Sequence, residues 1–133
     1  GCQMRSWSED GGKTWTAPEL TDLESPVSPA TIERMPGSDE LLLVWNDHEN
    51  VAEELKGKRT PLNVAVVAAD GKAILREYLL EDKPNGWYCY TAMQFVEDAV
   101  LLGYCAGEAP EIAHLSRTRI VRIPLEALGN GRP

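Results

Sequence analysis

Short apolar segments separated by frequent turn sequences are the feature that most constrains how this chain can fold. The turn sequences combine glycine, proline, serine and aspartate, and they lie at 10–12, 25–29, 36–40, 70–72 and 83–86. Apolar segments of this length between such breaks are typical of β-strands. We expect about nine strands, at 2–8, just after Trp15, and at 31–35, 41–46, 62–68, 74–80, 88–95, 99–105 and 117–125. The sequence therefore predicts an all-β protein.

Two of the expected strands indicate where the core lies. Residues 41–46, LLLVWN, form a continuous apolar run. Such a run is expected of a strand that is buried on both faces. In the segment 62–68, the alternation of a strand places Leu62, Val64 and Val66 on one face.

One segment carries a helical signal instead. In ENVAEELKG, residues 49–57, Asn50 followed by Glu53 resembles a capping box, and Gly57 suits the end of a helix. The segment is therefore either a turn or two of helix inside a loop between strands, or a charged and solvated loop.

The composition limits the classes of protein to which the chain can belong. Its 133 residues suffice for one ordinary domain, and a hydrophobic fraction of 43% can supply a core. The 13 basic and 21 acidic residues give a net charge of −8, whereas nucleic-acid binding needs clustered lysine and arginine. No apolar run reaches the roughly 18 to 20 residues that span a bilayer. We therefore expect neither a nucleic-acid nor a membrane partner.

The cysteines and the N-terminus leave the compartment open. Cys2, Cys89 and Cys105 show no metal-ligand spacing, so we expect no metal site and no cofactor. Cys89 and Cys105 fall in apolar strand-like segments, where small buried thiols are common. The first residues contain no signal peptide. This says little, because the natural gene product can begin upstream of Gly1.

The most patterned stretch is SEDGGKTWT, residues 8–16, in which Ser8, Asp10, Gly12 and Trp15 follow the pattern S-x-D-x-G-x-x-W. The Asp10 carboxylate can accept hydrogen bonds from backbone amides across a turn, and glycine permits positive φ. Trp15 can fold back over the strand pair. Too few oxygen donors are present for calcium. The pattern therefore predicts a structural hairpin, and it resembles the Asp-box (BNR) repeat.

A degenerate second copy of this pattern, AADGKAI, follows 60 positions later. It keeps Asp70 and Gly71, has Ala68 for the serine and Ile74 for the tryptophan, and is one residue shorter. The spacing exceeds the roughly 40 to 50 residues of many propeller blades, and the insertion at 49–57 accounts for the excess. Self-similarity on this scale favours stacked four-stranded units, hence a propeller rather than a sandwich.

The resemblance extends over nearly the whole chain. The stretches PATIERMPGSDELLLVWND, KRTPLNVAV and GWYCYTAMQFVEDAVLLGYC are similar, in order and spacing, to the C-terminal part of bacterial sialidase-like (exo-α-sialidase, BNR-repeat) propellers. The resemblance implies a partial β-propeller with antiparallel four-stranded blades, namely two to three blades of a six-bladed ring. Residues 1–24 would end one blade with the Asp-box, 25–82 would form a full blade, and 83–133 would form the final blade.

The resemblance also implies two site residues. Sialidases hold the substrate carboxylate with three arginines and attack the anomeric carbon with a tyrosine that a glutamate activates. Arg59 in KRTPL matches the last arginine of that triad, and Tyr90 in CYTAM matches the nucleophile. Both precede or begin strands on one rim of the sheets, away from Asp10. Tyr88, two residues earlier in the same expected strand, is the competing candidate.

Several other residues are weaker candidates. Asp47, His48 and Arg34 are expected near the same rim, as secondary contacts or as surface residues. Trp45 and Trp87 are expected in the core or at the rim, and Trp87 could stack on a sugar ring.

The remaining groups of a sialidase site are missing from the chain. A second triad arginine would fall just upstream of Gly1, and the first arginine, the acid/base aspartate and the glutamate earlier still; Arg5 is too close to the Asp-box and is expected to be a strand residue. A lone phenol with a pKa near ~10 is a poor nucleophile at neutral pH. The resemblance therefore predicts a C-terminal fragment or truncated relative of a sialidase-like glycoside hydrolase, carrying part of a site for sialic acid or another acidic sugar and inactive alone.

Two alternatives of other kinds remain. The chain could be a non-enzymatic carbohydrate-binding or self-assembling module that pairs through open blade edges, or a hydrolase completed by oligomerisation. Members of the sialidase-like family are often secreted or periplasmic, and the sequence leaves the location of this chain open.

Overall fold

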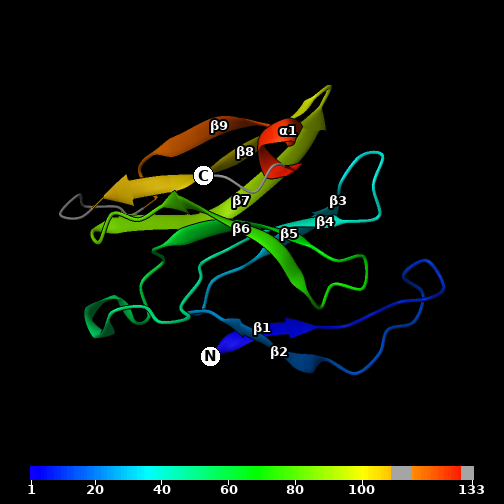
Figure 1. Ribbon diagram of the computed structural model, residues 1–133. Coiled ribbons are helices and arrows are strands. Elements are labelled where there is room, and N and C mark those ends of the chain that lie inside the picture. The colour runs from blue at the N-terminus through cyan, green and yellow to red at the C-terminus, as the bar shows by residue number, and fades with distance from the viewer. Residues whose placement is uncertain (109–114, 130–133) are drawn as a thin grey trace.

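The computed structural model describes residues 1–108 and 115–129, so the expected final unit at 83–133 lies partly outside the described residues. The described chain is all-β, as predicted, and forms three antiparallel sheets (Figure 1). The elements in order are β1 (Cys2–Arg5), β2 (Glu19–Glu24), β3 (Thr31–Arg34), β4 (Leu41–Trp45), η1 (Glu53–Leu55), β5 (Leu62–Val67), β6 (Ile74–Glu81), β7 (Gly86–Val96), β8 (Ala99–Glu108), β9 (Thr118–Pro124) and α1 (Leu125–Gly129).

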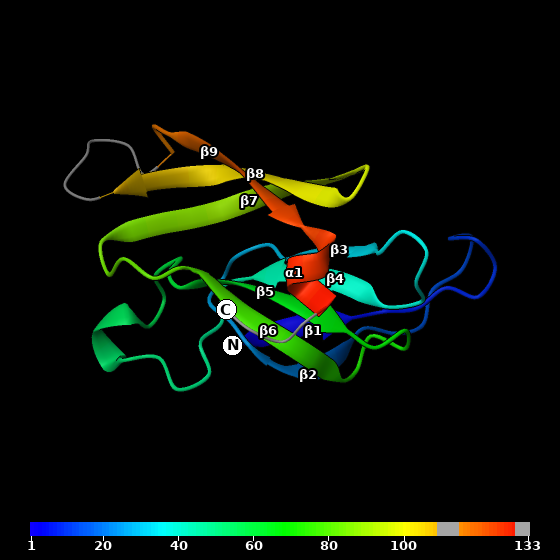
Figure 2. The ribbon, with the colours of Figure 1, turned by 45° about the horizontal axis from the view of Figure 1, so that its top comes forward.

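The strands pair with their neighbours in the sequence. β1 and β2 form a two-stranded sheet, β3 to β6 a four-stranded sheet, and β7 to β9 a three-stranded sheet. Figures 1 and 2 show these sheets as three stacked layers, with the four-stranded sheet in the middle. Tight connections join β3 to β4 (35–40), β5 to β6 (68–73) and β7 to β8 (97–98), whereas the segments 6–18 and 46–61 are longer.

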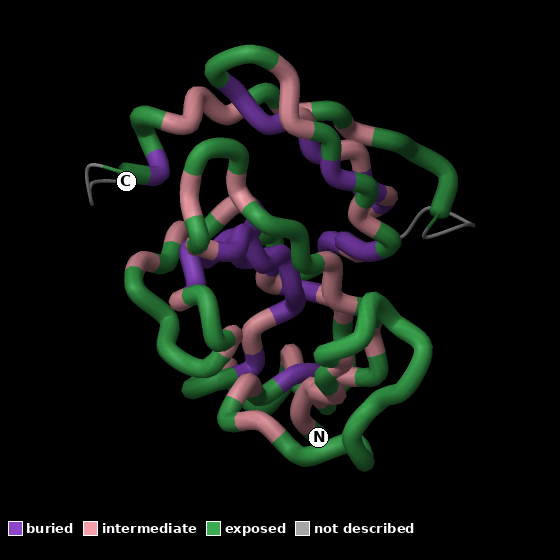
Figure 3. The backbone as a smooth tube through the Cα atoms, turned by 90° about the vertical axis from the view of Figure 1, so that its right-hand side faces the viewer, coloured by how far each residue is buried: buried purple, intermediate pink, exposed green. Residues whose placement is uncertain are grey.

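The middle sheet is buried on both faces because a sheet packs on either side of it. All residues of β4 and β5 are buried, which confirms the prediction for 41–46. Leu62, Val64 and Val66 pack with residues of β7 and β8 in the larger core cluster. The other face, with Trp45 and Ala65, packs toward β2. Figure 3 shows the buried segments gathered at the centre of the molecule.

A short helix closes the larger core. Leu128 of α1 is 2% exposed and belongs to that core. Its carbonyl oxygen accepts hydrogen bonds from Arg76 Nε at 2.8 Å and from Tyr78 Oη at 2.8 Å. These bonds tie the helix that follows β9 to strand β6 of the middle sheet. No helix in the described part of the chain has the length and apolar character needed to cross a membrane.

The predicted helix in 49–57 is one short 3-10 turn, and its predicted cap is wrong. The turn covers Glu53–Leu55, and the residue that precedes it is Ala52, which makes no side-chain cap hydrogen bond. Asn50 instead adopts a left-handed backbone with φ of 59°. A left-handed asparagine turns the chain sharply, so it ends the preceding loop rather than starting a helix. Gly57 follows the turn with φ of 80°, as a helix stop requires.

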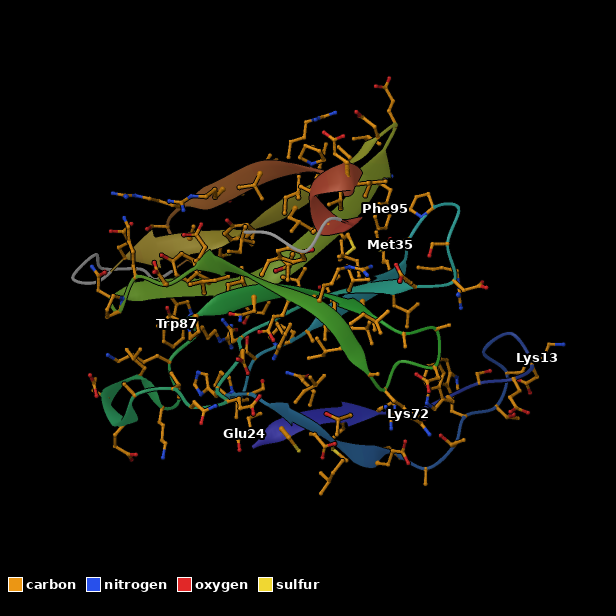
Figure 4. All side chains as sticks on the ribbon, in the orientation of Figure 1. Lys13, Glu24, Met35, Lys72, Trp87 and Phe95 are labelled. Atoms are coloured by element: carbon orange, nitrogen blue, oxygen red, sulfur yellow. The ribbon has the colours of Figure 1, made fainter. Side chains whose placement is uncertain are left out.

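The strands run between two ends of the molecule, which we name by their contents. The hairpin rim consists of residues 6–18, 35–40, 68–73 and 97–98. The pocket rim consists of 25–30, 46–61 and 82–85. In Figure 4, Lys13 and Lys72 mark the hairpin rim at the right, and Trp87 lies next to the pocket rim at the left.

Candidate functional site

At the hairpin rim, Asp10 is enclosed by donors of its own turn. Its Oδ1 accepts hydrogen bonds from Ser8 Oγ (2.9 Å), Lys13 N (3.0 Å) and Thr14 N (2.9 Å). Its Oδ2 accepts one from Thr14 Oγ1 (2.7 Å). The bonds from the Thr14 backbone, the Thr14 hydroxyl and Ser8 lower the pKa of Asp10 from 3.8 to about 2. These bonds occupy both carboxylate oxygens, so the residue closes the turn.

The other motif residues serve the same turn. Gly12 has φ of 85° and donates its N–H to Ser8 Oγ at 2.7 Å. The Trp15 side chain is 63% exposed and donates its indole N–H to the Gly12 carbonyl at 3.1 Å. Its contact is therefore with the turn that it follows.

In the degenerate turn at 68–73, the aspartate accepts fewer hydrogen bonds than Asp10 does. Asp70 Oδ1 accepts a hydrogen bond from Lys72 N at 3.0 Å, and the Ala68 carbonyl accepts one from Gly71 N at 2.8 Å. The two turns touch each other: Arg5 Nη1 donates to the Gly71 carbonyl at 3.0 Å, and a Cβ at Gly71 would lie 2.9 Å from the Trp7 ring. Arg5 is a strand residue, as predicted, and docks β1 on the middle sheet.

At the pocket rim, the two residues implied by the resemblance lie in contact. Arg59 comes just before β5 and Tyr90 lies in β7, yet the Arg59 guanidinium carbon is 4.9 Å from the centre of the Tyr90 ring. The same carbon is 5.5 Å from the centre of the Trp87 ring. Arg59 Nη2 also donates to the Val27 carbonyl at 3.3 Å. An arginine over aromatic faces is held by cation–π attraction, which keeps its planar fork in a fixed place.

Tyr90 has a strained backbone. Its φ is 56°, and it falls in a bulge of β7, where the pairing shifts between Cys89 and Ala92. Positive φ is uncommon for a bulky residue other than glycine, and such outliers concentrate at functional sites. The bulge also re-aims the side chain, and Tyr90 is 54% exposed. The bulge thus turns this tyrosine outward directly after the buried residues Tyr88 and Cys89.

Tyr88 occupies the opposite kind of environment. It is 0% exposed, its hydroxyl has no hydrogen-bond partner among the described residues, and its ring packs edge-on to Tyr104 at a centroid distance of 6.4 Å. Burial, with a smaller contribution from the charge of Glu81, raises the pKa of Tyr88 to about 12. A buried phenol with a raised pKa neither meets a ligand nor deprotonates readily. The geometry therefore favours Tyr90 over Tyr88 as a residue that can contact a ligand.

A buried thiol lies behind this pair. Cys89 is 1% exposed and pairs across the sheet with Cys105, and both are free thiols. Burial raises the pKa of Cys89, and the neighbouring Arg59 partly opposes that rise. The pKa of Arg59 is raised in turn: burial alone would lower it, and its interactions with Tyr90 and Cys89 outweigh burial. Arg59 therefore stays charged at all working pH values.

The side chains of Arg59 and Tyr90 line a pocket of about 1070 Å³. Besides Arg59 and Tyr90, the lining includes Gln3 of β1, Val27 and Ser28 of the 25–30 loop, His48, and Lys56 after the 3-10 turn. The cavity is thus built by segments from all three sheets. The lining carries the cations Arg59 and Lys56 and the anion Glu24, and Lys56 Nζ pairs with Glu53 Oε2 at 2.7 Å. Arg59 is therefore the lining residue that suits an anionic ligand. In the described part of the chain, no group of three or more histidine, cysteine, aspartate or glutamate side chains could hold a metal ion.

The weaker candidates divide between the two rims. His48 lines the pocket, and its Nε2 is 3.0 Å from the Lys58 carbonyl. Asp47 lines a different, smaller cavity, next to Trp45. Arg34 was expected near the pocket rim and lies at the hairpin rim instead, because β3 ends there and the side chain bonds the Asp39 carbonyl at 2.7 Å. Trp45 is a core residue at 1% exposed.

Sequence reasoning missed Val27 and Asn46. Val27 supplies its carbonyl to Arg59, and Asn46 is a buried polar residue whose bonds reach three separate segments. The one local signal was polarity: Asn46 ends an apolar run, and a buried asparagine must find partners.

Comparison with known proteins places this architecture in a family. The family model of the BNR repeat-like domain matches residues 1–103, which include the Asp10 hairpin, the whole middle sheet, Arg59 and Tyr90. None of the curated proteins and none of the solved structures that were compared matches the chain. Because the family model covers well over half of the sequence, this chain belongs to the BNR repeat-like domain family.

Proposed function

We propose that the pocket rim is part of a binding site for a carboxylated sugar of the sialic acid type. The observation that carries the proposal is the stacking of Arg59 on Trp87 and Tyr90 at the mouth of the pocket. A planar guanidinium binds a carboxylate through two parallel hydrogen bonds, and fixing the fork in advance reduces the entropy lost on binding. The exposed Tyr90 ring lines the pocket and offers an apolar face for a pyranose.

The fold that we propose around this site is part of a β-propeller. Three antiparallel sheets stacked face to face, each built from strands that are consecutive in the sequence, are the arrangement expected of successive blades. The four-stranded middle sheet would be one complete blade, and the sheets on either side would be portions of its neighbours. Membership of the BNR repeat-like family supports this arrangement.

In a complete site, Tyr90 would be the nucleophile of a sialidase-like glycoside hydrolase. A sialic acid carries a carboxylate on its anomeric carbon, so an anionic nucleophile would be repelled, and a phenol activated by a base avoids this repulsion. Such activation needs a positioned carboxylate, and the remaining two carboxylate-binding arginines would come from further blades. We therefore propose that the chain binds a sugar acid weakly and does not hydrolyse sialosides alone.

Calorimetric titration with N-acetylneuraminic acid tests the binding. The account predicts measurable binding of the free acid and at least about tenfold weaker binding of its methyl ester, because the ester lacks the charge that Arg59 would pair. Equal affinity for acid and ester would contradict a carboxylate site, and so would no binding of the acid at millimolar concentration.

A fluorogenic sialoside tests the proposed lack of turnover. We expect no release of fluorophore above the rate in buffer. Turnover that disappears in Tyr90→Phe would show instead that the chain is a complete enzyme, with Tyr90 as the nucleophile.

A second candidate function is self-assembly through the outer sheet. Met4 of β1 and Leu20 of β2 are directly opposite each other in the sheet, and they are 60% and 72% exposed. Adjacent apolar side chains on a two-stranded sheet favour association with another copy. Light scattering distinguishes the cases: assembly predicts a concentration-dependent mass that Leu20→Glu abolishes, whereas a monomer at all concentrations contradicts it.

A further inference from the structure

We propose that Asn46 is the positioning residue that holds Arg59 and Tyr90 in contact. Asn46 directly follows β4 and is 1% exposed. It lies outside the pocket lining, so its role is exerted through the backbone of the segments that carry the two site residues. The inference rests on the proposed function only where ligand affinity is concerned.

The side-chain amide of Asn46 joins two segments that are far apart in sequence. Its Nδ2 donates one hydrogen bond to the Pro61 carbonyl at 2.8 Å and another to the Tyr88 carbonyl at 3.1 Å. Pro61 is two residues after Arg59, and Tyr88 is two residues before Tyr90. A primary amide has two N–H donors, and here each donor holds one of the two segments.

We call the two hydrogen bonds from Asn46 Nδ2, to the Pro61 and Tyr88 carbonyls, the Asn46 clamp. A backbone hydrogen bond joins the same two segments directly. The Tyr88 N–H donates to the Arg59 carbonyl at 2.8 Å. Tyr88 therefore uses its N–H on the Arg59 segment and its carbonyl on Asn46, which fixes the start of β7 against the residues before β5. The bulge that turns Tyr90 outward begins directly after this fixed point.

The oxygen of the same amide holds the third segment of the site. Ser28 Oγ donates to Asn46 Oδ1 at 2.6 Å. Ser28 lies in the loop whose Val27 carbonyl accepts a hydrogen bond from Arg59 Nη2. One buried side chain thus reaches the three segments on which the Arg59 guanidinium depends. A buried network in which every donor is used rigidifies its surroundings, and such support keeps a binding site in its productive geometry.

Asn63 provides a matched control. It is also a buried asparagine of the middle sheet, at 8% exposed, and its Nδ2 donates to Glu77 Oε1 at 2.6 Å. Its bond joins β5 to β6 and makes no contact with the Arg59 or Tyr90 segments. Loss of this amide removes a comparable buried donor without touching the clamp.

The test uses a signal that does not require a ligand. Protons that lie over aromatic rings resonate upfield in NMR spectra, so the Arg59 side-chain protons should be upfield of those of Arg34, which has no such ring contact in the described chain. Asn46→Ala is expected to fold and to return the Arg59 protons to the range of Arg34, whereas Asn63→Ala should leave them upfield. A folded Asn46→Ala variant with the Arg59 shift intact would overturn the proposal.

Two further measurements test the positioning role if Asn46→Ala does not fold. Asn46→Leu keeps the approximate volume of the side chain, removes both donors and buries no charge; it should lose the shift in the same way, and retention would overturn the inference. In the unaltered protein, the side-chain amide protons of Asn46 should exchange with solvent at least about tenfold more slowly than those of the exposed Asn50. Equally fast exchange would also overturn it.

Ligand affinity separates this inference from the proposed function. Asn46→Ala should weaken binding of N-acetylneuraminic acid at least about tenfold, the size expected when a buried hydrogen-bonding group that orders a site is removed. If the unaltered protein does not bind the acid while Asn46→Ala loses the Arg59 shift, the proposed function fails and the positioning role stands. If binding in Asn46→Ala equals that of the unaltered protein, the positioning role fails alone.

Discussion

The two rims of this molecule place charged side chains in opposite situations. At the hairpin rim, Asp10 receives four hydrogen bonds from a turn of its own sequence neighbours. At the pocket rim, Arg59 rests on Tyr90 and Trp87 and takes its support from the segments around Val27 and Asn46. The Asp10 carboxylate is hydrogen-bonded within its own turn. The Arg59 guanidinium instead lines the pocket, and its contacts with two aromatic rings hold it in place.

This difference is why we propose the binding site at the pocket rim and not at the most recognisable motif of the chain. The hydrogen-bond partners of Asp10 all lie within four residues of it, which is why the motif can be recognised from the sequence. Because both carboxylate oxygens already accept hydrogen bonds, Asp10 has few lone pairs left for a ligand. The pocket rim shows the reverse pattern. It assembles its contacts from distant segments, and Tyr90 reaches the pocket from a bulge in β7.

Glycines that abut aromatic rings at the two rims give the largest expected effect. A Cβ at Gly86 would lie 2.3 Å from the Tyr88 ring, and one at Gly71 would lie 2.9 Å from the Trp7 ring. Tyr88 is fully buried and cannot move, whereas Trp7 is 36% exposed. We expect Gly86→Ala to lower the free energy of unfolding by about 3 kcal/mol, and Gly71→Ala by about 1 to 2 kcal/mol.

Urea denaturation measures both changes. Gly129→Ala is the control, because nothing lies within 4 Å of a Cβ there, and it should be close to neutral. An equal or larger loss in Gly71→Ala would show that the pocket rim is not the more tightly constrained of the two.

Arginine substitutions give the next largest effect, on binding rather than on stability. Arg59→Ala removes the charged donor to a sugar carboxylate and should weaken binding by about 2 kcal/mol, or roughly 30-fold. Arg34→Ala removes an exposed arginine at the hairpin rim that pairs with Asp39, and should leave affinity unchanged. Calorimetric titration of both variants compares them; similar affinities would remove Arg59 from the site.

Two residues with a left-handed backbone conformation, one at each rim, allow the effect of backbone strain on stability to be measured separately from the effect on ligand binding. Tyr90 at the pocket rim has φ of 56°, and Glu97 in the β7–β8 turn at the hairpin rim has φ of 48°. Glycine relieves such strain, so Glu97→Gly should raise the free energy of unfolding by about 1 kcal/mol. Tyr90→Gly should gain only about 0.5 kcal/mol, because it also loses the Arg59 contact. Thermal unfolding measures both, and only Tyr90→Gly should weaken sugar binding.

The smallest expected effect is the loss of stability at low pH when Asp10 of the hairpin rim is protonated. The pKa of Asp10 is lowered from 3.8 to about 2, chiefly by Thr14, so its ionised form favours the folded turn. That contribution is fully present above about pH 4 and is lost as the pH falls toward 2. The Thr14 amide proton shift should therefore titrate with an apparent pKa near 2. Asp10→Asn should remove this titration, whereas Asp70→Asn should leave it; titration near 4 would contradict the turn geometry.

The sequence predicted what local patterns determine. The strand at 41–46 is predicted because an uninterrupted apolar run needs two buried faces, and the strand at 62–68 is predicted because its alternation places Leu62, Val64 and Val66 on one face. The turn around Asp10 was predicted because its donors lie within four residues. The family resemblance and the strand order predict a common rim for Arg59 and Tyr90, and the structure adds their contact.

The failures come from longer-range or subtler effects. The helix cap at Asn50 was wrong because that residue takes a left-handed turn, and Arg34 was misplaced because its strand ends at the other rim. The clamp by Asn46 was missed because its acceptors lie 15 and 42 residues away. No local pattern reports such partners, and only the packed sheets bring them together.

The most direct test of the account is an NMR titration of the protein with N-acetylneuraminic acid, following backbone amides and the Arg59 side chain. We predict saturable shifts confined to the pocket rim, at 25–30, 46–61 and 82–85, and to the adjoining residues 87–90, with the Arg59 Nε–H among the largest. Shifts at the hairpin rim around Asp10, or none at saturating concentrations, would contradict it.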